Sequence, residues 1–96
     1  MTATSDDKRK ALAEILAAHP GNSCAVQYAR IRAALNRFSL TTFEAMRHLD
    51  VYDPRVRVLQ LCHAGKSITT TWSRITTESG HLHRVGVFVL GIGAPR

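Results

Sequence analysis

Residues 40–65, LTTFEAMRHLDVYDPRVRVLQLCHAG, predict two short helices joined by a sharp turn. Thr41 and Glu44 have the spacing of a capping box, in which each side chain binds the backbone amide of the other residue. The first helix is therefore expected to begin just after Thr41. We expect its buried face to hold Phe43, Met46 and Leu49.

The second helix of this stretch has a start signal and a stop signal. Asp53 is a suitable N-cap, and Pro54 suits the first helical position because its φ is preset and no needed donor is lost. Gly65 suits the C-terminal cap. We expect the inward face to hold Val58, Leu61 and Cys62. Two short capped helices separated by a turn are typical of a helix-turn-helix.

A β-hairpin is predicted after this pair of helices. Residues 67–76 and 82–90 are rich in Thr, Val, Ile and aromatic residues, and residues 77–80 (TESG) suit a turn. A four-residue loop would place Thr76 opposite His81 and Arg74 opposite His83. In that register the following residues would share one face: Ile68, Thr70, Trp72, Val85, Val87 and Val89.

Two more helices are predicted upstream. One begins after Ser5 and stops before Pro20; its narrow apolar stripe is consistent with docking on the body, pairing with a second subunit or fraying. The other is capped by Asn22 or Ser23 and runs to about Arg37. Its apolar face is expected to hold Cys24, Tyr28, Ile31, Leu35 and Phe38, with Arg30 and Arg37 away from it.

The order of these elements predicts an α+β fold that is mostly helical. It is a winged helix-turn-helix, a three-helix core with a C-terminal β-hairpin wing, preceded by an extra N-terminal helix. We expect an N-terminal arm and short helix over residues 1–22, the winged domain over 23–90 and a flexible tail over 91–96.

In such a fold the third core helix can enter the major groove of DNA. Its predicted DNA-facing residues are Arg55, Arg57, Gln60 and His63. Arg and Gln are suited to bidentate contacts with guanine and adenine. Arg57 could instead hold a neighbouring acid, Glu44 or Asp50, and His63 could instead cap the end of its helix.

Further residues are candidates for contacts with the DNA backbone. The wing tip is expected to offer Arg74, His81, His83 and Arg84 to a phosphate or the minor groove, unless it is only a solvated hairpin end. Thr41 and Thr42, at a helix start, and Lys66 could add phosphate contacts.

The bulk composition supports a polyanionic partner. Thirteen Lys and Arg oppose seven Asp and Glu among 96 residues, a net charge of +6. Cys24 and Cys62 are expected to be reduced core residues of an intracellular protein. A cytoplasmic location without a membrane partner follows from the lack of a long apolar segment or a secretory signal.

Catalytic and cofactor signals are weak. The pair Cys62 and His63 and the pair His81 and His83 do not match the paired spacing of a structural zinc site, so we expect no metal. There is no Gly-rich phosphate loop or nucleophile elbow. We therefore expect neither enzymatic activity nor a cofactor.

Several motifs resemble a family of small helix-turn-helix proteins of proteobacteria and their phages and prophages. Residues 40–45 (LTTFEA) and 49–51 (LDV) resemble its opening helix. The third helix resembles it through Pro54, Arg57, Val58, Leu61, Ala64 and Gly65, followed by Ile68 and Trp72, and the strand end 88–90 (FVL) matches as well. The resemblance covers about residues 31–90. It implies a winged-helix DNA-binding fold with a regulatory role, and it supplies no contact residues.

Two hypotheses of function follow. The first is a sequence-specific regulator of double-stranded DNA, repressor-like or a recombination accessory protein of a phage or mobile element, acting as a homodimer. The second is a winged-helix module that binds a protein, such as a phage-encoded inhibitor of a host protein. Exposure of Val56 and Leu59 as an apolar patch would favour the second.

Overall fold

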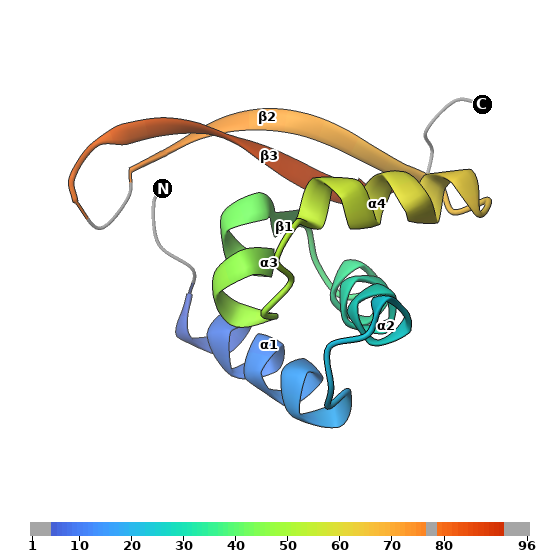
Figure 1. The fold of residues 1–96 in the computed structure, drawn as a ribbon. Helices are drawn as coiled ribbons and strands as arrows, with labels where there is room; N and C mark the ends of the chain where they lie inside the picture. The colour runs from blue at the N-terminus through green and yellow to red at the C-terminus, as the bar shows by residue number, and fades with distance from the viewer. Residues whose placement is uncertain (1–4, 77–78, 92–96) are drawn as a thin grey trace.

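The computed structural model describes residues 5–76 and 79–91 and has the predicted order of helices and hairpin (Figure 1). Its elements are α1 (Asp6–Ala18), α2 (Cys24–Leu35), β1 (Leu40–Thr41), α3 (Thr42–His48), α4 (Pro54–His63), β2 (Ile68–Thr76) and β3 (Leu82–Leu90). The sheet is antiparallel with the strand order β1-β3-β2. The hairpin of β2 and β3 extends beyond the helices (Figure 1). The two-residue strand β1 had no signal in the sequence.

One apolar core joins the four helices to the sheet. Its larger buried side chains are Leu12, Ile15, Ile31, Leu35, Leu40, Leu49, Val51, Val58, Leu61 and Phe88. Each helix contributes to it, because its apolar residues recur at helical spacing. The helices are thereby held against one face of the sheet, which positions α4 beside the hairpin (Figure 1).

Of the three alternatives for α1, the structure has it docked on the body. Leu12 is fully buried in the core, and Lys8 forms a 2.9 Å salt bridge with Glu44 of α3. The Lys8 ammonium also lies 5.0 Å from the centroid of the Phe38 ring. The core is therefore shared between α1 and the helices that follow it.

A buried arginine connects α2 to the ends of two other helices. Arg30, only 3% exposed, donates from Nε and Nη2 to the carbonyl of His19 at 3.0 and 2.7 Å. Its Nη2 also donates to Gly21 at 2.5 Å and its Nη1 to the carbonyl of Leu49 at 3.1 Å. His19 and Leu49 are the C-cap residues of α1 and α3, where a positive charge is favoured by the helix dipole. The sequence placed Arg30 away from the apolar face of α2. This prediction is wrong, because the Arg30 side chain is buried between the helices.

The predicted helix caps are mostly confirmed. Thr41 and Glu44 form both bonds of the capping box, with Thr41 Oγ1 accepting from Glu44 N at 2.9 Å and Glu44 Oε1 accepting from Thr41 N at 3.0 Å. Gly65 has a φ of +99°, and Lys66 N and Gly65 N donate to Leu61 and Cys62 at 3.0 Å, which is a Schellman ending of α4. Asp53 is the N-cap of α4, but its side chain makes no capping bond.

The predicted register of the hairpin is wrong by one residue. Trp72 pairs with Gly86 and Arg74 with Arg84, so Arg74 does not face His83. The prediction turned the valines of β3 inward, but Phe88 is the buried residue at 2% exposure. The inward face of β3 carries Phe88 and Leu90, which pack in or against the core, and Gly86, which lies opposite Trp72. Within the predicted turn, residues 77–78 lie outside the described residues, as do residues 92–96 of the predicted tail.

Three residues that were expected in the core are exposed or only half-buried. Cys24 is exposed at the first turn of α2, and Cys62 is only half-buried. Met46 is exposed as well, because Ala45 and Leu49 form the buried side of the short helix α3. An apolar side chain at helical spacing on a two-turn helix can therefore still lie beyond the edge of the core.

Substitution of Arg30 tests the link between the helix ends. Arg30→Ala leaves one buried and two partly buried carbonyls without their donor and should lower the free energy of unfolding by about 3 kcal/mol. Arg32→Ala removes an exposed guanidinium from the same helix and should change it by less than about 0.5 kcal/mol. Denaturant unfolding measures both, and equal losses would show that the bonds of Arg30 contribute nothing specific.

Candidate nucleic-acid interface

Helix α4 packs through one face and exposes the opposite one. Pro54, Val58 and Leu61 are buried. The exposed side carries Val56, Leu59, Gln60 and His63, which lie about half a turn away from the buried residues. The helix predicted to enter the major groove is therefore exposed along its length.

Trp72 of β2 brings an arginine of α4 close to an arginine of the wing. The guanidinium carbon of Arg55 lies 5.8 Å from the centroid of the Trp72 ring, and that of Arg84 lies 4.6 Å from it. Trp72 itself is 49% exposed. Such cation–π contacts are favourable and orient the guanidinium groups. We call these three residues the Arg-Trp-Arg cluster.

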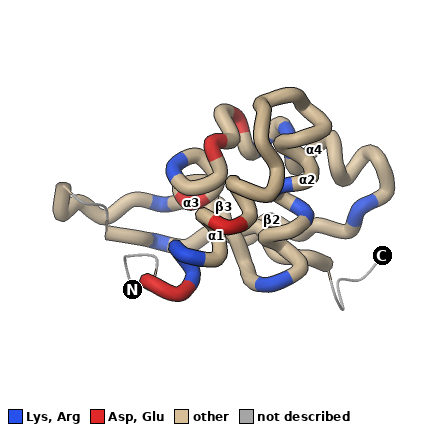
Figure 2. Tube along the Cα trace, turned by 90° about the horizontal axis from the view of Figure 1, so that it is seen from below, with Lys and Arg blue, Asp and Glu red and all other residues tan. Residues whose placement is uncertain are grey.

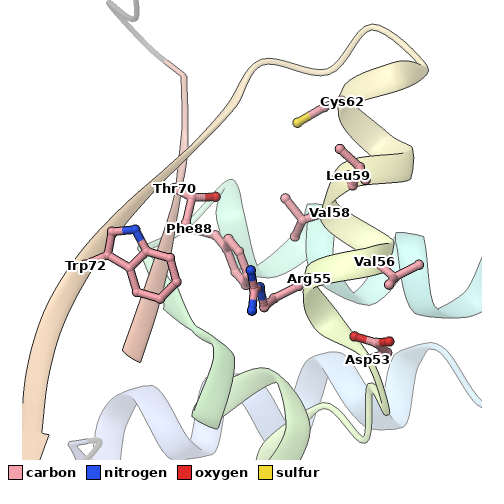
Figure 3. Close-up of a pocket in the computed structure, with 9 residues that line it drawn as sticks. All are labelled: Asp53, Arg55, Val56, Val58, Leu59, Cys62, Thr70, Trp72 and Phe88. Atoms are coloured by element: carbon pink, nitrogen blue, oxygen red, sulfur yellow. The ribbon is translucent and has the colours of Figure 1, made fainter. Parts of the chain in front are cut away.

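A groove of about 560 Å³ separates α4 from the hairpin. It is lined by Asp53, Arg55, Val56, Val58, Leu59, Cys62, Thr70, Trp72 and Phe88. Figure 3 shows Arg55 reaching from α4 across this groove toward Trp72, whereas Val56 extends away from Trp72. The indole lies against the backbone of β3, because a Cβ placed at Gly86 would be in ordinary van der Waals contact with Trp72 Cζ3, at 3.6 Å.

Arg57 and Gln60 are engaged with α2. Gln60 Oε1 accepts from Tyr28 Oη at 2.6 Å and from Arg57 Nη1 at 2.7 Å. The same Arg57 nitrogen lies 3.0 Å from Cys24 Sγ and donates to it. Neither Glu44 nor Asp50 pairs with Arg57, which was the alternative raised from the sequence; Lys8 holds Glu44 instead.

Positive charges predominate around the groove, although Asp53, the N-cap of α4, also lines it. Neither α4 nor β2 nor β3 contains an acidic residue, while together they carry Arg55, Arg57, Arg74 and Arg84. The described acids lie in α1, α3 and the turn from α3 to α4, and along the described part of the extended hairpin Figure 2 shows blue segments but no red one. A local surplus of positive charge favours the approach of a polyanion.

Comparison with known families assigns the fold. A family model described as a winged helix-turn-helix domain matches residues 26–92, which is more than half of the chain. The chain belongs to the winged helix-turn-helix family. No curated protein and no solved structure matches it. Domains of this family are usually DNA-binding modules without enzymatic activity.

The winged helix-turn-helix domain places the other predicted contact residues in two groups. Arg74 and Arg84 are a cross-strand pair, so they share the face of the wing that carries Trp72, whereas His83 lies on the other face. His81 precedes β3, with its Nδ1 3.2 Å from the Ser79 hydroxyl. The second group comprises Lys66 and His63, exposed near the end of α4, and Thr41 and Thr42.

The threonines at the start of α3 are the least available of the predicted contacts. Thr41 is buried, and its hydroxyl accepts from the Glu44 amide. Thr42 is half-buried, and its Cγ2 would lie 3.5 Å from a Cβ at Gly86. The amides of Thr41 and Glu44 are engaged in the capping box as well, so this helix start offers little to a phosphate.

Sequence reasoning missed the role of Trp72. The predicted register turned Trp72 toward the core and Arg84 to the opposite face. The arginines that stack on it, Arg55 and Arg84, come from α4 and β3, so the sequence around Trp72 held no local signal of the cluster. Tyr28 was likewise assigned to the core face of α2, although its hydroxyl reaches Gln60 of α4.

Metal and membrane features are not found in the described part of the chain. No group of three or more His, Cys, Asp or Glu in residues 5–76 and 79–91 could hold a metal ion. No helix in the same residues is long and apolar enough to cross a membrane.

The Arg-Trp-Arg cluster can be tested by fluorescence, because Trp72 is the single tryptophan. Arg84→Ala removes the guanidinium that lies 4.6 Å from the ring centroid and should raise the rate of acrylamide quenching of Trp72. Arg74→Ala makes the same charge change on the same face of the hairpin and should leave the quenching rate unchanged. Equal quenching in the wild type and Arg84→Ala would contradict the stacking.

Proposed function

We propose that this winged helix-turn-helix domain is a sequence-specific, double-stranded DNA-binding regulator, repressor-like or a recombination accessory protein of a phage or mobile element. Helix α4 lies in the major groove, and the wing lies on the flanking backbone. The resemblance to small proteins of proteobacteria and their phages supports the regulatory role and the origin. The observation that carries DNA binding is the Arg-Trp-Arg cluster on a surface whose helix and strands contain no acid.

Within this proposal, Arg55 and Arg84 bind backbone phosphates. Both guanidinium groups lie at the junction of α4 and the wing and not at the outermost part of the helix. Arg74, opposite Arg84 in the hairpin, adds a third phosphate contact. Arginine binds phosphate oxygens through two parallel hydrogen bonds, and stacking on an indole leaves those donors available in the plane of the group.

We also propose that two copies of the chain bind DNA together as a homodimer. One winged module buries only about 600–1,000 Å² on DNA, so two copies on adjacent half-sites would bind far more tightly than one.

A second candidate function is binding to a protein, such as a host protein that a phage-encoded inhibitor would block. It is favoured by the exposure of Val56 and Leu59, at 38% and 55%, on the outer surface of α4. Exposed apolar side chains on an accessible helix are typical of protein interfaces. The absence of acids from α4, β2 and β3 supports DNA as the first candidate.

Salt dependence of binding to a mixed-sequence duplex separates the two candidates. Contacts from Arg55, Arg74 and Arg84 predict a log–log slope of affinity against salt of about −2.7, at about −0.9 per phosphate. Fluorescence anisotropy of a labelled duplex measures the slope. If no duplex binds even at low salt, the DNA-binding proposal fails and the protein-binding candidate replaces it.

Arg55→Ala tests the assignment of a phosphate contact. It should weaken binding to every duplex by a similar factor and make the salt slope less steep by about 0.9. Lys10→Ala removes one positive charge from α1, which lies on the far side of the molecule from the hairpin (Figure 1), and should leave the slope unchanged. Relaxed preference at a single base pair would instead make Arg55 a base-reading residue.

A further inference from the structure

The outermost surface of the first two turns of α4 is apolar, because the two arginines of these turns are directed to either side, and the exposed His63 follows one turn later on the same face. Val56 and Leu59 lie on the side opposite the buried residues Pro54 and Val58 and are 38% and 55% exposed. Arg55 leans toward Trp72 on the wing side, and Arg57 leans toward α2. We call Val56 and Leu59 the apolar ridge of α4.

The polar residues beside the ridge are poorly placed to read bases. Bidentate recognition of adenine by Gln60 needs its amide oxygen as an acceptor, together with its amide nitrogen as a donor. That oxygen has two lone pairs and already accepts from Tyr28 Oη at 2.6 Å and Arg57 Nη1 at 2.7 Å. Arg57 would have to leave both Gln60 and Cys24 to reach a guanine.

The ridge matches one chemical group in the major groove. Each base pair presents hydrogen-bonding atoms there, and thymine alone also presents a methyl group, which apolar side chains contact. We infer that Val56 and Leu59 read thymine C5-methyl groups, so that the bound site has thymine at the positions that face the ridge. This inference rests on the proposed DNA binding and names how that site discriminates among sequences.

Charge complementarity favours DNA over a protein as the occupant of the ridge. Arg55 and Arg84 lie beside the ridge at Trp72, and α4, β2 and β3 contain no acidic residue. A duplex brings phosphates to those arginines and methyl groups to the ridge at the same time. The ridge consists of two side chains, which matches the size of one or two methyl groups better than that of a protein interface.

The test compares thymine with uracil, which keeps the same hydrogen-bonding atoms and lacks the methyl group. Bound duplexes are first selected from a random pool, and each thymine of the selected site is then replaced by deoxyuridine. Replacement at one or two positions should weaken binding about 3- to 5-fold, the factor expected for one buried methyl group. Fluorescence anisotropy at fixed salt measures each duplex.

Variants of the ridge complete the test. Leu59→Ala and Val56→Ala each remove one side chain that contacts a methyl group. In each variant, the ratio of affinities for thymine and uracil duplexes should fall below about 2-fold at the one position which that side chain contacts. Leu82→Ala removes a comparably exposed leucine, 59% exposed on the hairpin, and should keep the full difference. Far-ultraviolet circular dichroism checks that each variant is folded.

The possible results separate a failure of methyl reading from a failure of the proposed DNA binding. Binding with equal affinity for thymine and uracil, or a selected site without thymine, overturns methyl reading and leaves DNA binding in place. Loss of the difference in Leu82→Ala as well as in the ridge variants also overturns it. No binding to any duplex at low salt overturns the proposed function, and the inference with it, in favour of a protein occupant.

Discussion

The buried guanidinium of Arg30 is the interaction on which the arrangement of the helices depends. It donates to the carbonyls of His19, Gly21 and Leu49, which lie at or just after the C-terminal ends of α1 and α3. Helix ends leave carbonyls without partners, and burying them alone would be costly. One cation on α2 satisfies the carbonyls of two helix C-caps, His19 and Leu49, together with the loop carbonyl of Gly21, and balances two helix dipoles. The same contacts set the positions of α1 and α3 relative to α2, and so the core against which α4 and the sheet pack.

The register of the hairpin links this core to the candidate interface. Because Phe88 faces the core, Gly86 and Arg84 lie on the same face of β3, and Trp72 lies opposite Gly86. A shift of one residue would turn Arg84 to the far side of the wing, away from Arg55. Burial of one phenyl ring therefore decides that a cation of the wing and a cation of α4 meet at the same indole.

The exposed side chains of α4 point in three directions. Arg55 faces the wing, Arg57 and Gln60 face α2 through Tyr28 and Cys24, and the apolar ridge of Val56 and Leu59 faces outward. This division supports phosphate binding at the edges of the helix and apolar readout at its centre. Residue type alone favoured the reverse, with arginine and glutamine reading bases. The difference arises because hydrogen bonds inside the domain compete for the same donors and acceptors that bases would use.

The sequence by itself determined the local elements of this protein. The capping box of Thr41 and Glu44, the Gly65 stop and the β-rich runs predicted helices and strands nearly at their observed ends, because caps and turns act over a few residues. Relations between distant segments were decided by the tertiary structure alone. The burial of Arg30, the register set by Phe88 and the pairing of Gln60 with Tyr28 each depend on residues far apart in the chain. Periodicity shows which face of a helix or strand is apolar, but the partner that a polar side chain meets there depends on how the elements pack.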